Sequence, residues 1–472
     1  MPLPEEFTTY TRQLMGDSLY ERFADGLCSP SPVCIRLNPF KSEGWHIAPQ
    51  HAPEPVPWCR QGYYLSHRPN FTFDPLLHAG AYYVQDASSM FIDEILRQQV
   101  HHPVMMLDLC AAPGGKSTAC LSALPEGSLL FSNEPIALRA QILSENIQKY
   151  GHPDVVVTNN YPKDYVRSGL SFDVILTDVP CSGEGMFRKD EGAISEWSVQ
   201  HVEQCQRLQR EIVGSAWECL RPGGLLIYAT CTINTRENED QVVWMVEELG
   251  AEPVDIDTDE GWGIIGSLTS SCPHPVYRFL PGIVRGEGQF MAVMRKPGDD
   301  VSGKTRKPKG KSGKEKKVSH LPSNAAAIKD WLTDGEDYVL TLDDSTLYAI
   351  PKSWKSTIDN TSPLRILHRG IKAAVIKGHD ILPQHSLALS RALQAEAFPC
   401  VSITHGQAIA YLRKEAVVLP PDTPRGYVLL TYQGRPLGFV KNIGNRANNL
   451  YPQEWKVKSA HIPDDNVILS KI

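Results

Sequence analysis

Two cysteines and an aspartate follow two apolar runs that have the composition of buried strands. Asp178 and Cys181 stand in Asp-Val-Pro-Cys directly after the run 172–177, and Cys231 follows the run 225–229. A lone cysteine is most simply a small buried hydrophobic residue. Two cysteines at corresponding turns, one of them beside an acid, favour nucleophilic chemistry instead.

The predicted sheet brings these two turns together. From Pro103 onward the chain alternates strands with helices, and the strands are expected at 104–109, 128–133, 154–158, 172–177 and 225–229. Five successive strand–helix units predict a parallel sheet with both faces covered. In a doubly wound sheet of order 3-2-1-4-5 the fourth and fifth strands are neighbours, and ligands bind beyond the carboxyl ends of the strands. The cysteines and the aspartate should therefore converge on one crevice.

A glycine-rich turn follows the first of these strands, at 108–117. Such a turn lets the backbone approach a ligand, and the helix behind it offers free N–H groups. A phosphate-binding P-loop would need glycine at Cys110, and the G-x-G-x-x-G pattern fails because only Gly114 and Gly115 are present. A nucleotide-like ligand without a pyrophosphate remains.

The second predicted strand ends in an acid, Glu134. An acid at this place hydrogen-bonds the hydroxyls of a ribose. The alternative is a solvated glutamate that starts the helix at Pro135. A glycine-rich turn followed by an acid on the next strand is typical of enzymes that use S-adenosylmethionine.

A thiolate, an acid and a methyl donor fit one reaction well. Carbon 5 of a pyrimidine is too weak a nucleophile to take a methyl group unaided, but adding a thiolate to carbon 6 makes carbon 5 nucleophilic. A carboxyl group that protonates ring nitrogen 3 assists this addition. An amine methyltransferase usually carries a motif of the Asn-Pro-Pro-Tyr kind after the fourth strand, where this chain has Asp178-Val-Pro-Cys181.

Length and composition predict several regions. The fold class is α/β, with a Rossmann-like methyltransferase domain between an N-terminal α+β segment and a C-terminal α+β region. The expected boundaries are 1–100, 101–296, a basic flexible linker at 297–320, and 321–472. Hairpins are predicted around Asp343-Asp344 and Gln433-Gly434, a single helix over 5–28, and an antiparallel completion of the sheet over 251–295.

Charge and cysteine content indicate the kind of partner and the cellular compartment. The net charge is -7, and the basic run lies at 304–317, so any contact with nucleic acid should be local. The 11 cysteines form no disulfide framework, and no signal peptide or membrane-spanning run is recognised, so a cytoplasmic protein without a membrane partner is expected. No metal site is predicted.

The motifs resemble those of the Nop/Sun family of RNA cytosine-5 methyltransferases, and most closely the bacterial small-subunit ribosomal RNA methyltransferase F group. The matching stretches are 33–38, 85–90, 108–117, 178–183, 185–190, 228–231 and 237–239. The region 321–472 is similar to the group's C-terminal extension, which ends in a PUA-like RNA-binding module, here about 385–472.

The resemblance implies a role for each matching residue. Cys231 would attack cytosine carbon 6, Cys181 would help release the methylated base, and Asp178 would face both the cytosine and the donor. The residues implied to hold S-adenosylmethionine are Cys110, Ala111, Ala112, Pro113, Gly114, Gly115, Lys116, Glu134, Asn160 and Asp178. The family often has an acid that contacts adenine where this chain has Asn160, and an amide can make the same hydrogen bond.

The expected partner is RNA, with ribosomal RNA favoured over transfer RNA, and the expected oligomeric state is a monomer. Arg36, Arg188 and Lys189 are candidate RNA contacts, although the last two fit a solvated charged turn nearly as well. Two other functions remain open: a methyltransferase for amines or small molecules that shares the donor fold, and a non-catalytic RNA-binding or ribosome-assembly factor.

Overall fold

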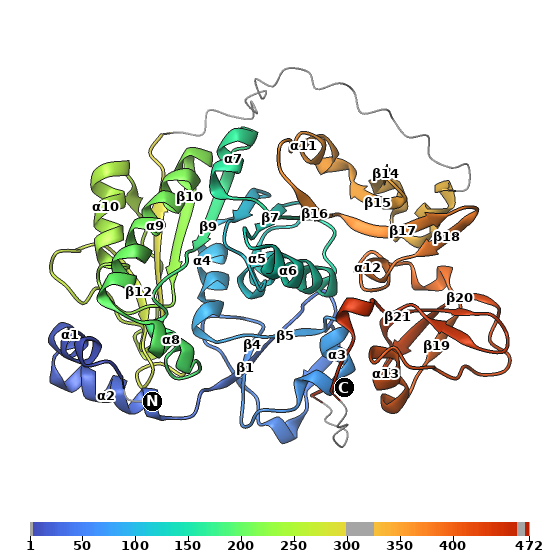
Figure 1. Cartoon of the computed structure of the whole chain (residues 1–472), viewed down its shortest axis with the longest axis horizontal. Helices are drawn as coiled ribbons and strands as arrows, with labels where there is room; N and C mark the ends of the chain where they lie inside the picture. Colours follow the sequence, from blue (N-terminus) through green and yellow to red (C-terminus); the bar gives the residue numbers. More distant parts are fainter. Residues whose placement is uncertain (1–2, 299–324, 460–467, 472) are drawn as a thin grey trace.

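A computed structural model describes residues 3–298, 325–459 and 468–471. Figure 1 shows a central sheet with helices on both faces, the N-terminal segment (blue) below it, and the C-terminal region (orange and red) to one side. The predicted linker lies outside the described residues, apart from residues 297 and 298.

The central sheet has the strand order β11-β13-β10-β9-β6-β7-β8-β16, and β12 pairs with β13. Its parallel core therefore reads 3-2-1-4-5 along the chain, as the sequence predicts. The core strands are β6 (Met105–Asp108), β7 (Leu129–Asn133), β8 (Val155–Thr158), β9 (Phe172–Asp178) and β10 (Leu220–Thr230). The helices of this region are α4 (Ile92–Gln99), α5 (Gly115–Ala123), α6 (Ala137–Tyr150), α7 (Pro162–Ser168), α8 (Glu191–Glu196), α9 (Val199–Cys219) and α10 (Glu239–Leu249).

Both faces of this sheet are buried. Consecutive residues of one strand belong to two different hydrophobic clusters, such as Met106 and Leu107 of β6 or Leu130 and Phe131 of β7. Side chains alternate between the faces of a strand, so a parallel sheet covered on both sides needs a continuous apolar run. This is why the core strands read as uninterrupted hydrophobic stretches in the sequence.

One edge of the sheet is completed by antiparallel strands. β13 (Gln289–Arg295) pairs antiparallel with β10, and β11 (Glu252–Pro253) and β12 (Tyr277–Phe279) pair with β13. The prediction for 251–295 is confirmed.

The N-terminal segment contains two helices where one was predicted. They are α1 (Glu5–Met15) and α2 (Asp17–Cys28), and the chain breaks between them at Gly16, whose φ is +72°. Glycine adopts this backbone conformation without the steric cost of a Cβ. The strands and the short helix that follow are β1 (Val33–Leu37), β2 (Trp45–Ile47), β3 (Glu54–Pro55), β4 (Gly62–Leu65), α3 (Pro75–His78) and β5 (Tyr82–Val84).

The C-terminal region has two four-stranded sheets, β14-β15-β17-β18 and β19-β20-β21-β22. Both predicted hairpins are present, as β14–β15 and β20–β21. The elements are β14 (Tyr338–Asp343), β15 (Thr346–Pro351), α11 (Lys355–Asp359), β16 (Ile366–Arg369), β17 (Ile371–Lys377), β18 (Asp380–Pro383), α12 (His385–Ala388), β19 (Cys400–Ser402), α13 (His405–Leu412), β20 (Gly426–Tyr432), β21 (Arg435–Asn442), β22 (Ala447–Asn449) and β23 (Leu469–Lys471).

The C-terminal region is joined to the rest of the chain by two strands. β16 adds to the free edge of the central sheet, antiparallel to β8, and β23 pairs with β2 of the N-terminal segment. One hydrophobic cluster also combines N-terminal side chains such as Ile35 and Trp45 with C-terminal ones such as Leu430 and Tyr451. The predicted regions therefore share cores and pack as one body.

Candidate active site

The sulfur atoms of Cys181 and Cys231 lie 3.3 Å apart. The two cysteines stand on the loops after β9 and β10, which are neighbouring parallel strands, and both side chains are half-buried. The backbone N–H of Gly185 donates to the carbonyl of Cys231 at 2.9 Å, which ties the two loops together. The structure thus brings together the two thiols that the sequence singles out.

The two thiols differ in acidity. Cys181 donates a hydrogen bond that stabilises the thiolate of Cys231 and, with the nearby Lys116, lowers the pKa of Cys231 although burial opposes the shift. The same hydrogen bond, together with burial, raises the pKa of Cys181. Cys231 is therefore the thiol that ionises first, which is the property a nucleophile needs.

Lys116 and Asp178 form an ion pair beside the thiols, with Nζ and Oδ2 2.9 Å apart. Burial favours the neutral form of Lys116, but the charge and hydrogen bond of Asp178 outweigh it and raise the pKa of Lys116. Lys116 lies in the first turn of α5 and Asp178 ends β9, so the pair connects the glycine-rich turn with the cysteine loops.

Two buried glutamates, Glu184 and Glu237, brace the cysteine loops. Glu237 accepts hydrogen bonds from the backbone N–H of Ser182 at 3.0 Å and from Gln209 of α9 at 2.7 Å. Glu184 accepts from the backbone N–H groups of residues 233 and 234 at 2.9 and 2.8 Å, and from the indole of Trp197. The pKa of Glu237 is raised, because the effect of burial exceeds the opposite effect of its hydrogen bonds.

The sequence did not single out either glutamate for this role. Glu237 lies in a stretch that matches the family, and Glu184 follows Gly183 at the end of another. The backbone N–H groups that they accept lie 49 to 55 residues away in the chain, so only the folded structure reveals this role.

The glycine-rich turn is held open by a buried polar network. The hydroxyl of Ser117 donates to Asp108 at 2.6 Å, and Gly114 has a φ of +114°, which suits only glycine. The other carboxylate oxygen of Asp108 is buried and has no partner among the described residues. Burial raises the pKa of Asp108 to about 7. An unpaired acceptor behind a glycine turn fits a ligand that presents N–H, O–H or positive charge.

Glu134 stands at the end of β7, as predicted. It is 1% exposed, accepts the backbone N–H of Ile136 at 2.9 Å and lies 3.5 Å from the guanidinium of Arg139. Arg139 also donates to the carbonyl of Ala112 in the glycine-rich turn, at 3.0 Å. Arg139 thus connects the acid at the end of β7 with the glycine-rich turn.

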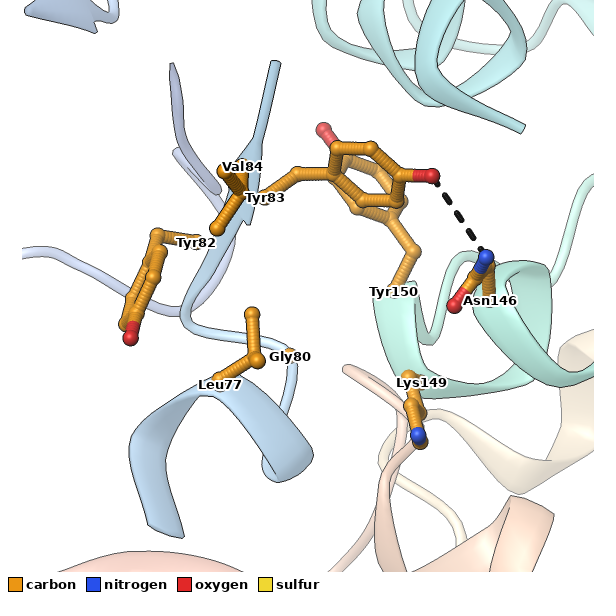
Figure 2. A pocket seen from close by; sticks show the side chains of 8 residues that line it. All are labelled: Leu77, Gly80, Tyr82, Tyr83, Val84, Asn146, Lys149 and Tyr150. Carbon is orange, nitrogen blue, oxygen red and sulfur yellow. Dashed lines mark hydrogen bonds between the residues drawn. The ribbon is translucent and has the colours of Figure 1, made fainter. Parts of the chain in front are cut away.

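The back of the turn faces a small cavity of about 220 Å³ between β5 and α6. In Figure 2 Asn146 of α6 reaches Tyr83, and the same amide donates to the carbonyl of Pro113 at 2.8 Å. A Cβ added to Gly115 would lie 3.4 Å from the ring of Tyr83. The cavity therefore backs onto the turn and is not the crevice that holds the thiols.

Asn160 ends up in an unexpected setting. Its amide nitrogen donates to the carbonyl of Arg365 at 3.2 Å, and its amide oxygen accepts the backbone N–H of Arg365 at 3.0 Å. Arg365 belongs to the C-terminal region and directly precedes β16. The residue implied to contact adenine is thus also a link between two regions of the molecule.

Arg36, a candidate RNA contact from the sequence, is buried inside the protein. It is 1% exposed, and its guanidinium donates to Gln85 at 2.9 Å, Thr118 at 2.6 Å and Ser122 at 2.9 Å. A charged group this deeply buried is stabilised by its protein partners and is not available to solvent. Arg36 instead attaches the N-terminal sheet to α5, the helix behind the glycine-rich turn.

Arg188 and Lys189 are held by an internal acid. Arg188 is 6% exposed and donates to Glu287 at 2.9 Å and to the carbonyls of Gly26 and Gly286. Lys189, 35% exposed, lies 3.1 Å from the same carboxylate. Arg188 therefore anchors the cysteine loop to the N-terminal segment, and of these two residues only Lys189 presents surface to a partner.

The order of the parallel strands, the glycine-rich turn and the acid at the end of β7 define the class of protein: a Rossmann-like methyltransferase that uses S-adenosylmethionine. Models of known families match three stretches. They are the 16S rRNA methyltransferase RsmB/F at residues 95–295, the N-terminal domain of 16S rRNA methyltransferase RsmF at 3–87, and the methyltransferase RsmF PUA domain at 398–457.

Curated relatives match nearly the whole chain. A ribosomal RNA small subunit methyltransferase F from Enterobacter sp. (strain 638) is 31% identical and covers 96% of this chain and 95% of its own length. One from Citrobacter koseri is 30% identical over 96% of each chain. The chain belongs to the ribosomal RNA small subunit methyltransferase F family.

Solved structures share the fold of a little over three fifths of this chain. A methyltransferase homolog protein from Pyrococcus horikoshii has a TM-score of 0.52 at 24% identity and covers 62% of this chain and 95% of its own. NSun6 from Pyrococcus horikoshii with SFG has a TM-score of 0.51 at 21% identity, over 63% of this chain and 99% of its own. The protein is thus an RNA methyltransferase with S-adenosylmethionine as its methyl donor. Within the described part of the chain, no helix is long and apolar enough to span a bilayer.

Proposed function

We propose that this protein methylates carbon 5 of a cytidine in 16S ribosomal RNA through a covalent adduct with Cys231. The observation that carries the proposal is the 3.3 Å contact between the sulfurs of Cys181 and Cys231, at the crevice that Lys116 and Asp178 also border. A methyltransferase for amines or small molecules needs no such pair of thiols, and neither does an RNA-binding assembly factor.

The difference in acidity between the two thiols supports different roles for them, with Cys231 as the nucleophile. The thiolate of Cys231 attacks cytosine carbon 6, ring nitrogen 3 takes up a proton through the carboxyl group of Asp178, and carbon 5 becomes nucleophilic. S-adenosylmethionine, when bound, supplies an electrophilic methyl group. Methylated carbon 5 then loses its proton, the bond between sulfur and carbon 6 breaks, nitrogen 3 returns its proton, and Cys231 is free again.

Cys181 is suited to the removal of the proton from carbon 5. Its hydrogen bond to Cys231 is the largest cause of its raised pKa. Once the sulfur of Cys231 is bonded to carbon it carries no charge, so this cause disappears and the pKa of Cys181 falls, although burial and Glu237 still raise it. The proton of Cys181 passes to solvent in this state. The resulting thiolate accepts the carbon-5 proton and starts the release of the product.

The substrate follows from the relatives and from the geometry. The relatives are named for the small ribosomal subunit RNA and match 96% of this chain, including the PUA domain. A cytidine stacked in a helix would have to be unstacked to reach half-buried thiols, at a cost of a few kcal/mol. A loop or a helix end of 16S ribosomal RNA is therefore the expected target.

The test measures both product and adduct. The protein is incubated with small ribosomal subunits, 16S RNA or transfer RNA and radiolabelled S-adenosylmethionine, and digests are analysed for 5-methylcytidine. Cys231→Ala should abolish methylation while donor binding persists, and Cys181→Ala should leave RNA covalently attached, as a shifted band on a denaturing gel. Cys400→Ala, which alters an exposed cysteine of the C-terminal region, is the matched control.

Three results would count against the proposal. Methylation of a base other than cytosine would exclude the chemistry, and full activity of Cys231→Ala would exclude the nucleophile. Methylation of transfer RNA in preference to ribosomal RNA would change the substrate but not the mechanism. Bisulfite sequencing of RNA from a deletion strain and its parent locates the cytidine.

A further inference from the structure

The end of β8 is closed by a residue from a distant part of the chain. Asn160 and the backbone of Arg365 exchange two hydrogen bonds, one in each direction, across 205 residues of sequence. The backbone N–H of Asn159 donates to the same carbonyl of Arg365 at 3.0 Å. An amide side chain here pairs with a backbone as a neighbouring strand would.

This contact continues into the donor turn through a third asparagine. The backbone N–H of Asn160 donates to the amide oxygen of Asn133 at 3.1 Å. The amide nitrogen of Asn133 donates to the carbonyl of Asn160 at 2.9 Å and to that of Leu109 at 3.0 Å. Leu109 directly precedes Cys110. An unbroken series of hydrogen bonds therefore connects Arg365 with the glycine-rich turn.

The position of Arg365 is set by the docking of the C-terminal region. β16, which begins at the next residue, pairs antiparallel with β8, and Leu364 lies in the core on one face of the central sheet. The guanidinium of Arg365 adds only an exposed hydrogen bond, 3.0 Å long, to Asn159. The backbone of Arg365, and not its side chain, is the part that reaches the buried Asn160.

The same end of the sheet carries exposed apolar side chains. Ile136, after β7, is 53% exposed, and Tyr161, after β8, is 70% exposed. Both follow strand ends that border the acid Glu134. Apolar surface beside polar groups that are already fixed in place is the usual make-up of a nucleotide pocket.

We propose that Arg365 is a positioning residue for the methyl donor, because its backbone holds the Asn160 side chain at the adenine end of the donor site. The docked C-terminal region thereby completes the site, and donor affinity depends on that docking. The inference deepens the proposed function and rests on the same crevice. Asn160, 7% exposed, keeps one N–H and one lone pair that its hydrogen bonds to Arg365 do not use.

The first test separates the backbone of Arg365 from its side chain. Arg365→Pro removes the N–H that Asn160 accepts, at the start of a strand, where proline is tolerated. Arg365→Ala removes only the guanidinium. The dissociation constant of S-adenosylhomocysteine is measured by calorimetry on the full chain without RNA. We expect an increase of about 3- to 10-fold for the proline variant, as for the loss of one ordinary hydrogen bond, and less than about 2-fold for the alanine variant.

The second test changes Asn160 itself. Asn160→Ala should weaken S-adenosylhomocysteine binding by about 10-fold, and Asn160→Asp, which can still accept the N–H of Arg365, should recover most of the affinity. In steady-state assays the KM for the donor should rise while kcat at saturating donor stays within about 2-fold, because the thiols are untouched. A general loss of folding would lower kcat as well.

Trp354→Phe is the matched control. The indole of Trp354 donates to the carbonyl of Gly127, so this substitution removes a different, exposed contact between the same two regions, at the opposite end of β7. It leaves β16 and the Arg365–Asn160 hydrogen bonds in place, and donor affinity should not change. Wild-type affinity in both Arg365→Pro and Asn160→Ala would overturn the inference. A wild-type protein that binds S-adenosylhomocysteine but forms no 5-methylcytidine would overturn the proposed function and leave this inference standing.

Discussion

The two ends of the crevice are built in different ways. At the end formed by β9 and β10, the thiols are braced by Glu184 and Glu237, which come from the same methyltransferase region. At the end formed by β8, Asn160 is held by Arg365, which comes from the C-terminal region 205 residues further along. The end that holds the thiols is thus built within one region, whereas the end at β8 is built between two.

Because of this difference, we expect substitutions at the two ends to affect different steps of the reaction. Changes at the cysteine end should affect the chemical step, because they alter the acidity or placement of the thiols. Changes at the β8 end should affect donor affinity and leave the chemistry intact. If Arg365 positions Asn160 as proposed, methyl-donor binding is sensitive to the docking of the C-terminal region.

The largest expected effect is that of Glu237→Ala. The substitution removes one acceptor from four groups: the backbone N–H and hydroxyl of Ser182 and the amides of Gln209 and Asn234. The backbone N–H of Ser182 loses its carboxylate partner, whereas the other three groups keep a second partner. We expect the free energy of unfolding to fall by about 3 kcal/mol and methylation to fall by about 100-fold or more. Glu237→Gln, which keeps one acceptor, should lose less. Normal kcat in Glu237→Ala would show that the hydrogen bonds of Glu237 are not required to position the cysteine loop after β9.

Arg36→Ala should come next, with a loss of about 2–4 kcal/mol in the free energy of unfolding measured by denaturant titration. The physical reason is that Gln85, Thr118 and Ser122 lose a buried partner. RNA affinity, measured where the variant is folded, should be unchanged. Weaker RNA binding at unchanged stability would show that Arg36 contacts RNA after all.

The acidity of Cys231 gives a pH-dependent prediction. The pKa of Cys231 is lowered by the hydrogen bond from Cys181. Its rate of alkylation by iodoacetamide, followed by peptide mapping, should be at its maximum above this pKa and should fall as the pH is lowered through it. The midpoint should lie below that of an ordinary thiol. In Cys181→Ala burial remains and the donor is gone, so the midpoint should move to higher pH, and Cys181→Ser should move it less.

The smallest effect is expected for Trp354→Phe, whose exposed hydrogen bond to Gly127 is worth about 1 kcal/mol or less. The melting temperature should change little, and donor affinity not at all. A large drop in melting temperature or in donor affinity would mean that the C-terminal region docks mainly through this contact. The donor site would then respond to changes far from Asn160, and the contrast between the two ends of the crevice would be lost.

Local sequence patterns predicted the parallel strand order, the hairpins β14–β15 and β20–β21, and the meeting of Cys181 with Cys231. They missed one local break and the surroundings of one arginine. The single helix expected over 5–28 breaks at Gly16, and Arg36, expected to face RNA, is buried against α5. No periodicity distinguishes an arginine that binds RNA from one that closes an internal network.

The sequence by itself determined the class of chemistry, because thiols and an acid that directly follow neighbouring parallel strands must meet at the carboxyl edge of the sheet. It also determined the donor turn, since only glycine adopts the backbone conformation required at Gly114. Only the tertiary structure decided which thiol is the more acidic, which glutamates brace the loops, and that Arg365 reaches Asn160. These properties arise from distances and burial between segments that the chain order leaves far apart.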